Sequence, residues 1–391
     1  MRAGVLVGTL LVTWAMSGAS CAAGAEAGYL QQTPSMEQVR RAWQARQDRV
    51  RTARIAWTEK RFVAARSKWP RRDGKAPGRL KDGEWLPERD LTFESTGEIA
   101  LSGKMLRYVH EGAYWHDSFG ELLQKKYVAT FDAETAQSHF THTPPRVHGL
   151  RPLGFIDPDP RHPNTRYYML KPVLMTFRAC DPDTGGVDPA KYAVSAKTAF
   201  IDQTLCVGVT WTGKRRDQTT FWVDPQRDFL VLRIAILDGS AHPVATTDIS
   251  YQRDALHGWV PSGWKWVYHG GFSSVREQAA AKVTRCEINV DIPRSEFQID
   301  YPPGTLVRNL KTKEDYIVRP DYGKRPITKA EIARGATYEE YLSTESGMAG
   351  LKKPALAQRV LGWTVGGLVL LVVVAVFWRL RARAHRREGD S

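Results

Sequence analysis

Residues 217–237 read DQTTFWVDPQRDFLVLRIAIL, and this stretch indicates the dominant type of element in the chain. Apolar and β-branched residues form two runs, at 217–224 and 228–237, with the turn residues Asp224-Pro225-Gln226 between them. Runs of this length bounded by turn residues predict two strands joined as a hairpin. The fold is therefore expected to be built mainly from antiparallel strands.

Similar runs lie on both sides of this hairpin, at 53–65, 91–101, 104–111, 125–132, 204–212, 243–252, 262–272 and 281–292. The clearest alternation is at 286–292, where Cys286, Ile288, Val290 and Ile292 alternate with polar residues. Alternation predicts a sheet with one covered face and one face in water. A sheet of about 10–11 antiparallel strands is expected to curve strongly, because flat sheets of this width are unusual.

Helices are expected at few places, which makes the predicted class α+β. Residues 33–52 fit one helix, because Ser35 and Gln38 match a capping box and Met36, Val39, Trp43 and Val50 form a narrow apolar stripe. A short helix is expected near 171–178, with Pro172 at its start. A further small helix is expected within 328–342.

The N-terminus has the order of a secretory signal. Arg2 precedes an apolar run from Ala3 to Met16, and small residues follow. This order predicts a signal peptide at 1–27 that is removed on export. Because Gly18-Ala19-Ser20 precede Cys21, lipidation of Cys21 is the alternative to simple cleavage.

The C-terminal region predicts one transmembrane helix at 359–379. Val360 to Trp378 carries no charged residue, and five arginines follow between Arg379 and Arg387. The heavier basic flank stays in the cytoplasm, so the main domain is expected in the periplasm, tethered to the inner membrane. The expected organisation is an exported domain at 28–320, a polar linker at 321–358, the membrane helix, and a basic cytoplasmic tail at 380–391.

The chain is basic, with a formal net charge of +14. Such a charge favours anionic lipid head groups, whereas export argues against nucleic acid as a partner. The basic stretch Lys60–Lys81 contains Trp69 and is expected to contact anionic lipid. A solvated loop is the alternative interpretation of this stretch.

No catalytic, cofactor-binding or metal-ligating residue is predicted. The sequence contains no Gly-x-Ser-x-Gly elbow, no phosphate-binding glycine loop and no His-Glu-x-x-His pattern. Removal of the signal leaves Cys180, Cys206 and Cys286, of which two could pair. A binding role is therefore expected rather than an enzymatic one.

Two segments resemble the outer-membrane lipoprotein carrier family (LolA/LolB-like). Trp222-Val223-Asp224-Pro225, with the strand ending at Arg233, is similar to the hairpin of that family, and Val50–Thr58 is similar to its join between helix and first strand. The resemblance covers about residues 35–310 and implies an open half-barrel, an apolar cavity and short helices that plug its mouth. The C-terminal tether and the insertions at 66–90 and 142–165 depart from a diffusing shuttle.

The resemblance implies a membrane-tethered, non-catalytic periplasmic protein that binds lipid acyl chains or lipidated proteins. Aromatic residues of alternating strands are the expected ligand-lining side chains: Trp57, Trp222, Phe229, Trp264, Trp266 and Tyr268. The alternative function is an envelope sensor or protein-interaction module that acts through a membrane partner. The sequence leaves open which sheet face forms the cavity.

Overall fold

The computed structural model describes residues 33–65, 86–116, 119–143, 151–158, 170–182, 186–213, 217–269 and 275–343. The chain divides into two compact units, Met1–Asp300 and Tyr301–Ser391. The first unit contains the long strands and the two helices that cover them. The predicted signal peptide and the predicted membrane helix both lie outside the described residues.

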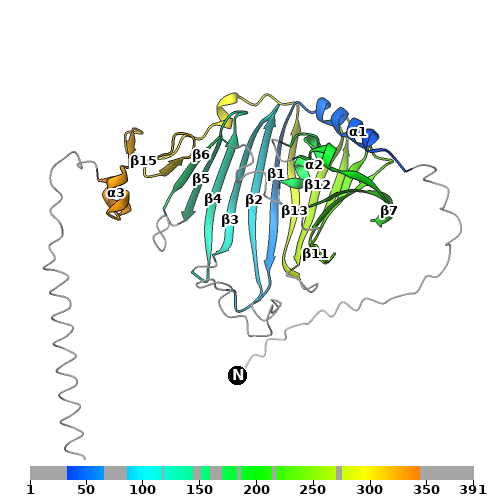
Figure 1. Cartoon of the computed structure of the whole chain (residues 1–391), viewed down its shortest axis with the longest axis horizontal. Helices are drawn as coiled ribbons and strands as arrows, with labels where there is room; N and C mark the ends of the chain where they lie inside the picture. The colour runs from blue at the N-terminus through cyan, green and yellow to red at the C-terminus, as the bar shows by residue number, and fades with distance from the viewer. Residues whose placement is uncertain are drawn as a thin grey trace, which may run out of the picture. The chain divides into compact units, whose positions relative to one another are not determined.

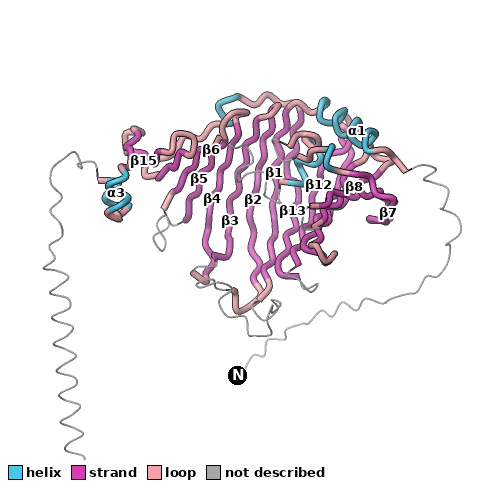
Figure 2. The backbone as a smooth tube through the Cα atoms, in the orientation of Figure 1, coloured by secondary structure: helices cyan, strands magenta, loops and turns pink. Residues whose placement is uncertain are grey.

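The first unit contains a large, strongly curved antiparallel sheet (Figure 1; Figure 2). Its strands follow the order β6-β5-β4-β3-β2-β1-β13-β12-β11-β10-β9-β8-β7. Their bounds are β1 (Thr52–Val63), β2 (Leu91–Ser102), β3 (Met105–His116), β4 (Glu121–Phe131), β5 (Ala136–Thr143), β6 (Leu153–Asp157), β7 (Ala193–Ile201), β8 (Thr204–Thr212), β9 (Gln218–Asp224), β10 (Leu230–Leu237), β11 (Pro243–Asp254), β12 (Gly258–His269) and β13 (Val275–Ile288). The prediction of a large curved antiparallel sheet is confirmed.

Every neighbouring pair in this order is also consecutive along the chain, except β1 and β13. These two strands pair antiparallel from Ala53 opposite Ile288 to Val63 opposite Glu277. The sheet therefore consists of two local ladders, β1 to β6 and β7 to β13, joined along one long-range seam. The seam places β1 near the middle of the sheet.

Helix α1 (Met36–Arg49) begins with the capping box expected from the sequence, since Ser35 and Gln38 exchange side-chain and backbone hydrogen bonds. Its apolar stripe is buried at Val39 and Trp43, which pack against β8 to β11. Trp43 Nε1 donates to the Phe229 carbonyl oxygen at 2.8 Å. This bond anchors the helix to the turn between β9 and β10, where Phe229 has a positive φ of 55°.

Helix α2 (Lys171–Phe177) lies between the two halves of the curved sheet. Val173, Leu174 and Phe177 pack in a cluster with β1 to β5 and β12, whereas Met175 packs with α1 and β8 to β11. A helix of seven residues can reach both strand groups only if the sheet curves around it. We define the face that α1 and α2 cover as the inner face.

The end of α2 is held by Arg178, whose side chain is buried. Its guanidinium donates to the carbonyl oxygens of Val50, Arg51 and Gly103 at 2.8, 2.9 and 3.2 Å. Burial lowers the pKa of Arg178 from its ordinary value. These bonds fix one end of α2 to the loops at the ends of β1 and β2.

Position 97 of β2 has no room for a side chain, because the indole of Trp57 lies directly over Gly97. A Cβ at Gly97 would come within 2.2 Å of two ring carbons of Trp57. Gly97→Ala is therefore expected to destabilise the protein by about 1–3 kcal/mol, the usual effect of overpacking a core. Chemical denaturation measures this change, and the effect should shrink in a Trp57→Ala background. An equal loss in both backgrounds would contradict the assignment to Trp57.

One predicted strand ends earlier in the structure than expected. The run at 281–292 was expected to be one strand, but β13 ends at Ile288 because Asn289 takes a positive φ of 56°. Val290 and Ile292 consequently leave the ladder and pack against Ala100 on the outer face of β2. The alternation at 286–292 therefore comes partly from the end of β13 and partly from the segment that follows it.

Strands β5, β6 and β7 were not predicted at all. Their sequences, AQSHFTHT, LGFID and AVSAKTAFI, are short or rich in small and polar residues. They form strands because β4 and β8 offer neighbouring ladders, and pairing context outweighs weak intrinsic preference in sheets.

The second unit contains β14 (Leu306–Asn309), β15 (Glu314–Val318) and β16 (Lys324–Pro326), which pair antiparallel in sequence order. The single helix expected within 328–342 is instead two short helices, α3 (Lys329–Ala333) and α4 (Tyr338–Leu342). Gly335, with a φ of 67°, separates them. In the part of the chain that the structure describes, no helix is long and apolar enough to cross a membrane.

Candidate ligand-binding interior

The inner face brings together five of the six aromatic residues expected to line a ligand site. Trp57, Trp264 and Trp266 are buried on this face, and Tyr268 is half-buried beside Trp266. Phe229 lies in the turn before β10, where its side chain packs against the cluster beneath α1 and its backbone carbonyl binds that helix. Trp222 instead lies on the outer face, packed against the cluster of Cys206, Leu230 and Leu232. The ligand-lining role of all six remains a prediction.

An aromatic layer crosses the inner face of neighbouring strands. The ring centroids of Trp57 and Trp264 are 5.0 Å apart, and those of Trp57 and Tyr108 are 6.2 Å apart. The layer continues through Tyr127 to Phe140, whose ring centroids are 4.4 Å apart. Helix α2 covers this layer with apolar side chains. The covered region is thus filled by protein atoms, and a ligand could reach it only after α2 moves.

A layer of titratable groups lies beside the aromatic layer on the same inner face. Glu59 follows Trp57 by two positions on β1 and is only 1% exposed. Neither of its carboxylate oxygens has a hydrogen-bond partner within the described part of the chain. His110 of β3 is 4% exposed, and its Nε2 lies 3.2 Å from Ser95 Oγ. Glu59 is therefore a buried carboxyl group without hydrogen bonds to stabilise its charge.

The buried environment shifts the pKa values of Glu59, His110 and Lys125 in the directions that favour their neutral forms. Burial raises the pKa of Glu59 to about 7, although the cation of Arg61 opposes the shift. Burial lowers the pKa of His110 to about 3, and burial together with Arg61 lowers that of Lys125 to about 8. Arg61 itself is paired with Glu277 of β13. Desolvation is the dominant cause in each case.

Lys125 and its neighbours continue this layer toward β5. The Lys125 ammonium lies 4.5 Å from the ring centroid of Tyr114, whose hydroxyl oxygen is 3.2 Å from His142 Nδ1. Burial lowers the pKa of His142 as well. The inner face therefore presents an apolar, aromatic region followed by a partly neutral polar region, an arrangement suited to an amphipathic molecule.

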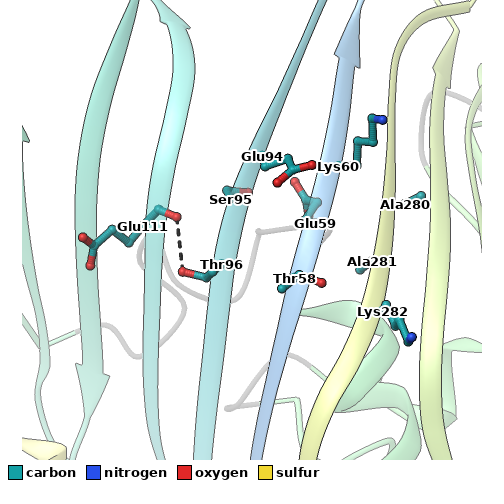
Figure 3. A pocket seen from close by; sticks show the side chains of 10 residues that line it. All are labelled: Thr58, Glu59, Lys60, Glu94, Ser95, Thr96, Glu111, Ala280, Ala281 and Lys282. Carbon is teal, nitrogen blue, oxygen red and sulfur yellow. Dashed lines mark hydrogen bonds between the residues drawn. The ribbon is translucent and has the colours of Figure 1, made fainter.

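A hollow of about 490 Å³ lies on the outer face of β13, β1, β2 and β3 (Figure 3). Its exposed lining alternates in sequence with the buried inner-face residues: Thr58, Lys60, Glu94, Thr96, Glu111, Ala280 and Lys282. Thr96 Oγ1 donates to the Glu111 carbonyl oxygen at 3.4 Å. The lining carries two lysines and two exposed glutamates, so it has no marked charge preference. Glu59, Ser95 and Ala281, whose side chains are buried, also line the hollow.

Glu59, His110 and Lys125 were not identified as site residues from the sequence. The sequence does contain a signal that could have identified Glu59. Alternation along β1 assigns Ala53, Ile55, Trp57 and Glu59 to the interior, and a carboxylate at such a position is unusual. The three cysteines Cys180, Cys206 and Cys286 are all free. Burial raises the pKa of Cys206 and of Cys286 to about 11, which makes both poor nucleophiles.

No protein-family model matches the sequence, and no curated protein matches it either. Similar solved structures include a DUF1329 family protein from Desulfovibrio piger, at 10% identity and a TM-score of 0.40, covering 67% of this chain and 95% of that chain. A protein domain from Vibrio parahaemolyticus, described as outer membrane lipoprotein-sorting, has 8% identity and a TM-score of 0.39, covering 67% and 97%. A LolA superfamily protein from Nitrosomonas europaea has 11% identity and a TM-score of 0.36, covering 67% and 98%.

The resemblance to LolA-like proteins predicted from the sequence is confirmed by LolA-superfamily structural neighbours, and a DUF1329 family protein is a further neighbour. All three TM-scores are below 0.5. The function proposed below is therefore argued from the residues of this chain.

Proposed function

We propose that the first unit binds an acyl chain or a lipidated partner on the inner face of its curved sheet, without catalysing a reaction. The observation that carries this proposal is that the curved sheet encloses α2. The apolar side chains of α2 pack on the aromatic layer, where a hydrocarbon chain could lie instead. Apolar side chains and an acyl chain gain from the same removal of surface from water. In this proposal α2 is a plug that yields its place to the ligand.

The construction of α2 supports this role. Its N-cap residue, Leu170, makes no side-chain capping hydrogen bond. Its other end is anchored through Arg178. In this proposal α2 moves about its anchored end, and contacts with the ligand replace the apolar contacts that its buried side chains lose.

We propose further that the chain is anchored in the inner membrane by Val360–Trp378, with the curved sheet in the periplasm. The absence of charge in this segment and the arginines after it support the anchor and its orientation. Within the basic stretch Lys60–Lys81, residues 60–63 belong to β1, where Arg61 is paired with Glu277. Residues 66–81, which lie outside the described residues, would add contacts with anionic lipid head groups. Tethering would keep the binding face close to the lipid from which a ligand is taken.

The test is photochemical labelling of the full chain in the membrane of a bacterial host fed a diazirine-bearing fatty acid. We expect covalent lipid adducts on inner-face peptides of β1 and β12, mapped by mass spectrometry. Trp266→Ala combined with Tyr268→Ala should reduce this labelling several-fold, because the buried Trp266 is stacked on the half-buried Tyr268 at the inner face. Trp222→Ala is the matched control, since Trp222 lies on the outer face.

Adducts confined to 360–378 would contradict binding by the curved sheet while leaving the membrane anchor intact. Equal labelling in the inner-face and outer-face variants would contradict the choice of face. Either result would favour the alternative of a protein-interaction module acting through a membrane partner.

A further inference from the structure

A second cavity lies away from the aromatic layer, between the C-terminal end of α1, the β9–β10 turn and the β11–β12 turn. It has a volume of about 330 Å³. Four arginines line it, Arg46 and Arg49 from α1, Arg227 from the first turn and Arg253 near the second. Asp228 contributes the one carboxylate among its lining residues. The cavity therefore carries a clear excess of positive charge.

Arg46 is the buried arginine of this cavity, with only 4% of its surface exposed. Its Nη2 donates to the Asp228 carbonyl oxygen. Its Nη1 is buried and has no hydrogen-bond partner in the described ranges. Burial lowers the pKa of Arg46 from its ordinary value. A buried guanidinium with an unused donor is unfavourable unless an acceptor is supplied.

Arg227 and Arg49 make contacts that leave hydrogen-bond donors available. Arg227 is paired with Asp224, and its guanidinium carbon lies 5.1 Å from the ring centroid of Trp259. Arg49 Nη2 is 3.9 Å from Asp228 Oδ2, and both side chains are largely exposed. Stacking on an aromatic ring orients a guanidinium without using its hydrogen-bond donors.

The acidic groups near the cavity do not cancel its charge. Asp224 is engaged with Arg227, and Asp254 accepts from the ring Nδ1 of His257 at 2.9 Å. Against the four guanidinium groups of the lining, Asp228 and the nearby Asp224 and Asp254 provide three carboxylates. The remaining excess favours an anionic ligand, and several forked donors from different elements suit a tetrahedral oxyanion.

We propose that this cavity binds a phosphoryl group, either of a lipid head group or of a free phosphate. The site would supply the acceptor that Arg46 lacks and neutralise the guanidinium groups around it. Its position is separate from the aromatic layer, so the proposal does not depend on acyl-chain binding there. Clustered arginines are suited to bind phosphate, because each planar guanidinium group donates a fork of hydrogen bonds to the phosphate oxygens.

The test is calorimetric titration of the full chain, purified in a neutral maltoside detergent at low ionic strength, with three soluble probes. These are inorganic phosphate, glycerophosphoglycerol as the deacylated head group of an anionic lipid, and acetate. We expect saturable binding of phosphate or of the head group and much weaker binding of acetate. Tighter binding of glycerophosphoglycerol would assign the site to lipid, and tighter binding of inorganic phosphate would assign it to a free ion or monoester.

Arg49→Gln combined with Arg253→Gln removes two exposed lining charges and leaves the buried Arg46 in place. We expect this variant to raise the Kd for the preferred probe about tenfold, which corresponds to about 1.4 kcal/mol. Arg41→Gln combined with Arg89→Gln is the charge-matched control, since Arg41 is 75% exposed and both residues lie outside the cavity. The control should change Kd by less than about twofold, the effect of altered net charge alone.

Equal weakening in the two double variants would overturn the proposal, because it would show only general attraction to a basic protein. Acetate binding as tight as phosphate binding would overturn the phosphoryl assignment. Failure of all three probes to bind saturably would show that Arg46 serves only to hold the β9–β10 turn.

Discussion

Glu59→Gln is expected to stabilise the protein by about 3 kcal/mol near pH 8 and to change little near pH 4. Burial raises the pKa of Glu59 from 4.5 to about 7, and each unit of pKa corresponds to about 1.4 kcal/mol. The folded state prefers the protonated carboxyl group, so the associated stability is fully present below pH 4.5. It is lost as the pH rises through about 7.

Urea unfolding of the native chain and the variant at several pH values measures this difference. The buried His110 acts with the opposite sign, because its pKa is lowered from 6.5 to about 3. The stability that the neutral His110 contributes to the folded state is present above pH 6.5 and is lost as the pH falls through about 3. Since both proteins contain His110, its effect cancels in the comparison.

The exposed Glu94 on the outer face of β2 supplies the control for this measurement. Glu94→Gln should change the free energy of unfolding only slightly, because the side chain is exposed. A Glu59→Gln variant that is less stable than the native chain near pH 8 would show that the charged carboxylate has partners in solution. That result would remove Glu59 from the candidate site.

Trp57→Ala is expected to lower the free energy of unfolding by about 3–5 kcal/mol, the usual range for a buried aromatic side chain. Trp57 is 1% exposed and contacts Tyr108, Trp264 and Gly97. Its removal would leave a cavity at the centre of the aromatic layer. Denaturant unfolding at a fixed pH measures the loss.

Trp222→Ala is the comparison, because Trp222 is only half-buried and lies on the outer face. The free energy of unfolding should fall less in Trp222→Ala than in Trp57→Ala, by about 1–2 kcal/mol. Equal losses at the two positions would mean that the outer face contributes as much burial as the inner face. The distinction between a covered face and a largely wet face would then fail.

The sequence predicted the antiparallel sheet well where apolar runs are bounded by turn residues. The hairpin at 217–237, the capping box at Ser35 and the short helix after Pro172 are all present. Each of these features depends on residues within a few positions of one another. The strands β5 to β7 were missed because their stability depends on neighbouring ladders rather than on their own composition.

The site was less predictable than the sheet. Alternation grouped Trp264, Trp266 and Tyr268 correctly on one face, but it could not relate the faces of distant strands. Trp222 was assigned with them although the register of β9 directs Phe221 and Val223 inward. The four-arginine cavity was also missed, because its members come from segments far apart in the sequence.

The seam between β1 and β13 has a consequence for the order of folding. Arg51 and Asn289, 238 positions apart in the chain, are hydrogen-bonded at one end of this seam. The ladders on either side can form from neighbouring hairpins, whereas the seam requires closure of a loop that contains most of the unit. Until synthesis has delivered β13, the strand at the centre of the finished sheet has an unpaired edge. A chain in that state is exposed to wrong pairing and aggregation, so we expect the pairing of β1 with β13 to be the slowest and most vulnerable step of folding.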